Sequence, residues 1–158
     1  MGLLRGHLKI LALEQKNVPC FSGDVLTLGR QAVYATFKEV QSIYRGVGLP
    51  ICPLPEREDI RNKIPVWKST RYDRYTNAEV VLKMLGAKNV YACDINNYEN
   101  PDFIFDLNIK VPVEFYNRFD VVFDCGTLEH VFDIGEGLRN ICRMLKVGGT
   151  VVLINPAS

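Results

Sequence analysis

The stretch at residues 119–130 constrains this chain more than any other part of its sequence. It opens with the apolar run VVF at 121–123, a pattern typical of strands that are covered on both faces. Gly126 then breaks the pattern, and Thr127, Glu129 and His130 follow it. Strands covered on both faces belong to parallel sheets, and ligands bind at the carboxyl ends of such strands. The stretch therefore predicts an α/β fold with a ligand site directly after this strand.

Strand-like and helix-like patterns alternate along the rest of the chain. The alternation implies right-handed crossovers and a doubly wound, mainly parallel sheet of about five strands, with helices on both faces. We expect strands at 25–28, 89–93, 103–105, 119–123 and 150–154, and helices over 3–16, 31–44, 76–86 and 134–145.

Local signals define the ends of the last two predicted helices. Residues 76–79 read Thr-Asn-Ala-Glu, which predicts a capping box, and Gly86 is a natural stop. Asp133 is the predicted cap of the last helix. The buried stripe of that helix is expected to consist of Leu138, Ile141, Cys142 and Leu145.

The 158 residues are enough for a single domain of ordinary size. Within it we distinguish an N-terminal helical segment, 1–21, and a loop insert, 46–75, that is rich in Gly and Pro and has room for one helical turn around 56–61. Trp67, Tyr72 and Tyr75 near the end of the insert are expected to pack onto the core, the alternative being that they line a substrate pocket.

Composition excludes several classes of function. The net charge is +1, so no nucleic-acid partner is expected. Five scattered cysteines without a CxxC pair, together with two histidines, predict neither a metal site nor a disulfide framework, and they suit reduced thiols in the cytoplasm. The apolar stretch at 3–13 is too short to span a membrane.

Polar or glycine residues end four of the predicted strands. Gly29, Asp94, Asp106 and Asp124 each follow an apolar run, and the carboxyl ends of parallel strands meet at one edge of the sheet. Several carboxylates along one edge predict a ligand with hydroxyl and amine groups to bind.

The series of strand, polar loop, helix, LKVGG and strand resembles the second half of a class I S-adenosylmethionine-dependent methyltransferase, and the resemblance extends over about residues 22–156. It implies a Rossmann-like sheet and S-adenosylmethionine as cofactor. The family's last two strands are lacking, so we expect either a fragment or a naturally short protein. An exposed fifth strand would offer an edge for a homodimer.

The resemblance also assigns roles to individual residues. Asp94, with Ile95, would contact the ribose, and Asp106, with Leu107, would contact the adenine amine. Gly29 would allow a close backbone approach. The implied cofactor-binding set is Gly29, Arg30, Gln31, Asp94, Ile95, Asp106, Leu107, Asp124, Cys125 and Gly126. The motif at 124–127 would lie beneath the methionine end and face the substrate.

The first glycine motif departs from the family pattern. Thr27 replaces the usual acidic residue, and Arg30 and Gln31 follow Gly29 where further glycines are expected. Arg30 or Gln31 would then bind the carboxylate of the methionine moiety, since arginine suits that geometry. The alternative is that Arg30 is a surface residue at a helix start.

The predicted function is methyl transfer to a small-molecule or saccharide acceptor. His130 is the candidate base, because imidazole titrates near neutrality, and Glu129 would orient it or act itself. The alternative for His130 is a structural role. The alternative for the whole chain is a degenerate methyltransferase-fold domain that binds a partner without catalysis. A nicotinamide enzyme is disfavoured, because no GxGxxG motif is present.

Overall fold

The computed structural model describes residues 2–56, 58–61 and 74–155. In chain order its elements are β1 (Gly2–Leu3), α1 (Arg5–Asn17), β2 (Asp24–Leu28), β3 (Ala32–Val33), α2 (Phe37–Gly46), α3 (Ala78–Leu85), β4 (Asn89–Asp94), β5 (Phe103–Ile104), the 3-10 turn η3 (Val113–Phe115), β6 (Phe119–Asp124), the 3-10 turn η4 (Leu128–His130), α4 (Ile134–Met144) and β7 (Leu145–Leu153).

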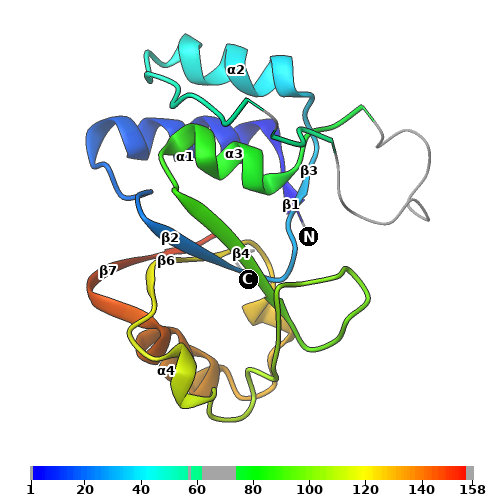
Figure 1. Ribbon diagram of the computed structural model, residues 1–158, viewed down its shortest axis with the longest axis vertical. Helices are drawn as coiled ribbons and strands as arrows, with labels where there is room; N and C mark the ends of the chain where they lie inside the picture. The colour runs from blue at the N-terminus through cyan, green and yellow to red at the C-terminus, as the bar shows by residue number, and fades with distance from the viewer. Residues whose placement is uncertain (1, 57, 62–73, 156–158) are drawn as a thin grey trace.

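Five of the strands form one parallel sheet in the order β5-β4-β2-β6-β7. Helices α1, α2 and α3 lie on one side of this sheet and α4 lies on the other (Figure 1). The predicted doubly wound α/β fold, with about five parallel strands and helices on both faces, is therefore confirmed. β1 and β3 pair separately as a short parallel ribbon.

Alternating side chains of the central strands supply two separate cores. Val25, Val121 and Phe123 are fully buried against the face that carries α1 to α3. Leu26 and Val122 point the other way, into the core beneath α4. The strands read as continuous apolar runs because both faces of the sheet are covered.

Asp120 connects neighbouring strands at the amino-terminal end of the sheet. Its Oδ2 accepts hydrogen bonds from the backbone N–H of Asp24, at 2.7 Å, and from the ammonium group of Lys146, at 2.8 Å. The carboxylate thus joins β2, β6 and β7. The hydrogen bond from Lys146, followed by that from Asp24, lowers the pKa of Asp120 below its usual range.

We expect Asp120→Ala to lower the free energy of unfolding by about 1 kcal/mol at neutral pH, since the pair is partly exposed and screened by solvent. Because the folded-state pKa is depressed, this contribution is present above the carboxyl's ordinary pKa and is lost as the pH falls below about 4. Urea unfolding of both proteins between pH 3 and 7 measures it. A difference that stays constant across this range would contradict the assigned ion pair.

The predicted helix over 31–44 is wrong in its first half. Ala32–Val33 pairs with Gly2–Leu3 instead, and α2 begins at Phe37. Thr36 caps α2 by accepting a hydrogen bond from the N–H of Glu39, whose carboxylate accepts from the N–H of Thr36. Because residues 32–33 pair as a strand, the helix begins only at the capping box at 36–39.

Two local predictions around α3 and α4 also need correction. α3 is capped by Asn77 rather than Thr76, because the Thr76 hydroxyl donates to the carbonyl of Ile60. On α4, Leu138 is 43% exposed and Cys142 is exposed. The residues of α4 that are buried are Gly137, Asn140, Ile141 and Met144. Asp133 and Gly86 act as predicted, as N-cap and C-terminal stop.

β7 is the edge strand next to β6. Gly148 and Gly149 lie inside it, in an irregularity between the pairs Phe119–Leu145 and Val121–Thr150, and do not precede it as predicted. Val151 and Leu153 are 44% and 43% exposed. Among the described residues β7 has no strand on its other side, and pairing of this edge with a second copy stays a prediction.

The insert at 46–75 falls partly outside the described residues, as do Trp67 and Tyr72. Its described residues after Gly46 contain no helix or strand, and the predicted turn at 56–61 includes residue 57, which is not described. The Tyr75 ring packs against Tyr34, at 6.3 Å between centroids. No helix among the described residues is both long enough and apolar enough to cross a bilayer.

Candidate functional site

A cavity of about 420 Å³ lies at the carboxyl ends of β2, β4, β5 and β6. This volume is in the range of small-molecule sites. Ten of the predicted site residues line it: Gly29, Arg30, Gln31, Asp94, Ile95, Asp106, Leu107, Cys125, Gly126 and His130. They converge because Leu28 is in register with both Cys93 and Asp124, so the strand ends reach the same edge.

Gly29 turns the chain away from β2 in a conformation that favours glycine, with φ at +71°. A Cβ atom at this position would lie 3.0 Å from Oγ1 of Thr127. That hydroxyl is held in place because it donates to the carbonyl of Leu28, at 2.6 Å. The turn therefore presents bare backbone to the cavity.

Gln31 is 4% exposed and carries an unmatched acceptor. Its Nε2 donates to the carbonyl of Leu28, at 2.6 Å. The opposite amide orientation would place Oε1 against this carbonyl, so the hydrogen-bond network decides the assignment. Oε1 has no hydrogen-bond partner among the described residues. A buried acceptor without a partner is costly, and a donor group on a ligand would satisfy it.

The two strand-end carboxylates each use one oxygen to shape their own loop. Oδ1 of Asp94 accepts from the N–H of Asn96, at 3.3 Å. Oδ1 of Asp106 accepts from the N–H and the amide group of Asn108, at 2.8 and 2.7 Å. Neither second oxygen bonds to a described residue, so both carboxylates retain acceptor capacity at the cavity.

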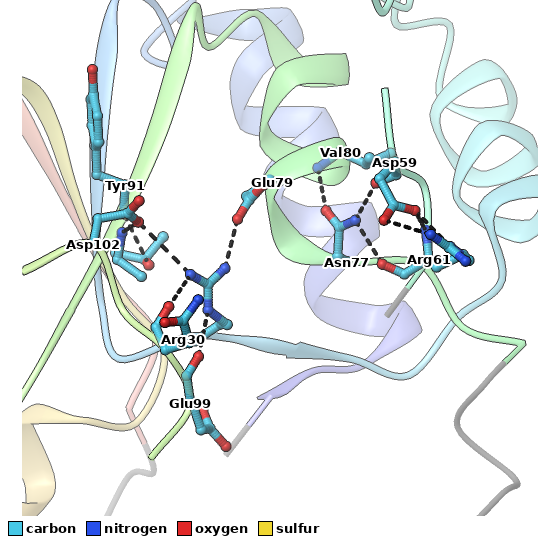
Figure 2. Close-up of polar contacts among 12 residues, drawn as sticks. Arg30, Asp59, Arg61, Asn77, Glu79, Val80, Tyr91, Glu99 and Asp102 are labelled. Atoms are coloured by element: carbon cyan, nitrogen blue, oxygen red, sulfur yellow. Dashed lines mark hydrogen bonds and ion pairs between the residues drawn. The ribbon is translucent and has the colours of Figure 1, made fainter. Parts of the chain in front are cut away.

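Arg30 lines the cavity, and its guanidinium lies in a polar cluster with Glu79, Glu99 and Asp102 (Figure 2). It donates to the Glu79 carboxylate, at 2.6 Å, and to the carbonyls of Glu99 and Asn100, at 3.0 and 2.8 Å. The side chain is only 13% exposed. In this arrangement Arg30 is therefore neither available to bind a ligand carboxylate, as predicted, nor an exposed surface residue, as in the alternative.

Asp124 does not line the cavity, contrary to prediction. It is fully buried, and its two oxygens accept from the N–H groups of Thr127 and Leu128, at 2.8 and 3.3 Å. The carboxylate therefore shapes the turn after β6 instead of facing the cavity.

Burial raises the pKa of the Cys125 thiol to about 11 and that of the Cys93 thiol to about 12, so these thiols stay protonated and unreactive at neutral pH.

His130 stands at the exposed side of the cavity. Its side chain is 75% exposed, and its Nε2 lies 3.4 Å from Oε1 of Glu129. Glu129 itself does not line the cavity. The pair thus has the arrangement of an accessible imidazole with a neighbouring carboxylate, which is compatible with the predicted orienting role.

Asn140 on α4 is a site-shaping residue that the sequence interpretation missed. It is fully buried. Its Nδ2 donates to the carbonyls of Leu107 and Ile109, at 3.0 and 2.8 Å, while Oδ1 accepts from the N–H of Val111, at 3.0 Å. The available signal was a polar residue at helical spacing from Gly137 and Met144, on the inner face of α4.

We expect Asn140→Leu to lower the free energy of unfolding by about 3 kcal/mol, because it leaves three backbone groups without a partner. Amide exchange at 107–111 should accelerate more than exchange in β2, since the lost bonds hold that segment. Urea unfolding and hydrogen exchange measure the two effects. Unchanged stability would show that Asn140 does not hold the cavity wall.

Two comparisons relate this chain to known proteins. The family model described as "Methyltransferase domain" matches residues 74–153, just over half of the chain. The crystal structure of the trans-methyltransferase CalH in complex with SAH aligns with 94% of this chain, at 14% sequence identity and a TM-score of 0.41. The chain spans 35% of that protein's length. No match to this sequence was found among curated proteins.

Proposed function

Because this chain belongs to the methyltransferase domain family, we propose that it binds S-adenosylmethionine in the cavity at the carboxyl edge of its sheet and transfers the methyl group to an acceptor. The observation that carries the proposal is the convergence of Gly29, Asp94 and Asp106 on one cavity. When bound, the cofactor supplies a methyl group that its sulfonium already activates.

The chemistry of the cavity suits an adenosyl amino acid. Asp94 and Asp106 each have an oxygen available to accept from a ribose hydroxyl or an adenine amine. The unmatched Oε1 of Gln31 would accept from an ammonium group, which donates without accepting. Gly29 lets the backbone approach a ligand without a side chain in between. Asp124 would act indirectly, by shaping the turn that contains Cys125 and Gly126.

We expect Asp94→Asn to weaken binding of S-adenosylhomocysteine by about tenfold or more, since it removes the charge from one bond to the ribose. Asparagine keeps an oxygen acceptor for the N–H of Asn96, so the turn after β4 is preserved. Titration calorimetry measures the affinity.

Glu114→Gln is the matched control, because it neutralises an exposed carboxylate on η3 that does not line the cavity. The control should bind as tightly as the wild type. Equal affinity of the wild type and Asp94→Asn would remove Asp94 from the site. A folded wild type that binds neither S-adenosylmethionine nor S-adenosylhomocysteine would favour the alternative, a partner-binding domain without catalysis.

For the acceptor we propose a small molecule or saccharide hydroxyl, with His130 taking its proton and Glu129 orienting the imidazole. The support is positional: His130 lines the cavity, is accessible, and has a carboxylate 3.4 Å from its Nε2. The other contribution of the protein would be alignment, since holding the methyl donor and the acceptor in line lowers the activation barrier of the transfer.

With an acceptor identified by screening, we expect His130→Gln to lower kcat by about a hundredfold or more, the usual effect of removing a general base. The affinity for S-adenosylhomocysteine should not change. A variant with full kcat would leave His130 with the structural role considered above.

A further inference from the structure

We propose that Arg30 is a positioning residue that holds the loop between β4 and β5 in the conformation that forms one wall of the cavity. The contacts are those of the described residues, and only the identity of the ligand rests on the proposed function. The loop, 95–102, contributes Ile95, Asn96, Tyr98 and Glu99 to the cavity lining.

The guanidinium contacts the carboxyl-terminal end of this loop. Its Nε donates to the carbonyl of Glu99 and one terminal nitrogen donates to the carbonyl of Asn100. The same nitrogen lies 3.8 Å from Oδ2 of Asp102, which itself accepts from the N–H of Ala92 on β4. Figure 2 shows Arg30 between Glu79, Glu99 and Asp102.

The remaining terminal nitrogen fixes the guanidinium to α3. It donates to Glu79 at 2.6 Å, and both side chains are mostly buried, at 13% and 18% exposed. Arg30 therefore connects the turn after β2, the first turn of α3 and the end of the loop. Only arginine presents several donors in one rigid plane, so lysine cannot reproduce the set.

The start of the loop is organised by its own side chains, whereas its end is held by the pairing of Asp102 with Ala92 on β4 and by the hydrogen bonds from Arg30. Asp94 accepts from the N–H of Asn96, and Asn96 accepts from the N–H of Tyr98. Asn100 follows with φ at +50°, which is uncommon for a residue other than glycine. In this conformation the Asn100 carbonyl accepts from Arg30, and the Asn100 N–H donates to the carbonyl of Asn97.

The test uses Arg30→Lys and two ligands, S-adenosylhomocysteine and 5′-methylthioadenosine, which lacks the amino acid end. We expect Arg30→Lys to weaken both ligands by the same factor, about tenfold, because the loop contacts the adenosyl part that they share. Amide exchange at 95–101 in the ligand-free protein should accelerate by about tenfold or more. Arg30→Met should enlarge both effects. If Arg30→Met does not fold, the result for Arg30→Lys alone decides the test.

The matched control is Lys83→Met, which removes another ion pair of α3. Nζ of Lys83 lies 2.7 Å from Oε2 of Glu58, and the two side chains are similarly buried, at 21% and 12% exposed. Neither residue lines the cavity. Lys83→Met should lose about as much stability as Arg30→Lys. Amide exchange at 95–101 and the affinities for both ligands should not change. An effect of the control on the loop equal to that of Arg30→Lys would reduce the role of Arg30 to general stability and overturn the proposal.

The remaining outcomes separate the proposal from its alternatives. Weaker binding of S-adenosylhomocysteine alone would mean that Arg30 binds the amino acid carboxylate, which would overturn the proposal. Unchanged loop exchange would overturn it as well. If the wild type binds neither ligand, the proposed function fails, whereas faster exchange at 95–101 in Arg30→Lys would still establish the positioning role.

Discussion

The parallel pairing of β2 with both β4 and β6 is the constraint on which the rest of the structure depends. Each parallel connection must cross a face of the sheet before the next strand begins, so helices cover both faces and the strands become continuous apolar runs. The same pairing places Cys93, Leu28 and Asp124 side by side at the carboxyl edge. A cavity with converging polar groups at this edge follows directly from the topology.

Buried polar side chains convert this edge into a defined cavity. Asp124 holds the turn after β6, Asn140 holds the 107–111 segment against α4, and Arg30 holds the end of the β4–β5 loop. Each bonds to backbone groups of the segment that it holds, so these segments have a defined conformation.

Membership of the methyltransferase family, predicted from the series of strand, polar loop, helix and LKVGG, is confirmed by the family match over 74–153. The weakest part of the prediction was the region after Gly29. A helix was expected there, because Gln31 to Tyr44 has apolar residues at helical spacing. The pairing of Ala32–Val33 with Gly2–Leu3 overrides that local preference, since a strand's partner is not encoded in the strand itself.

By itself the sequence determined the core of each strand in the main sheet, the polar strand ends and most of the residues that line the cavity, because apolar periodicity and strand-end carboxylates are local patterns. Only the tertiary structure decided what each polar side chain does. Arg30 bonds to groups 49 to 70 residues away, and Asn140 to groups about 30 residues away, at separations that no local pattern encodes. The polar partners depend on which loops the sheet brings together, and that is settled only when the chain has folded.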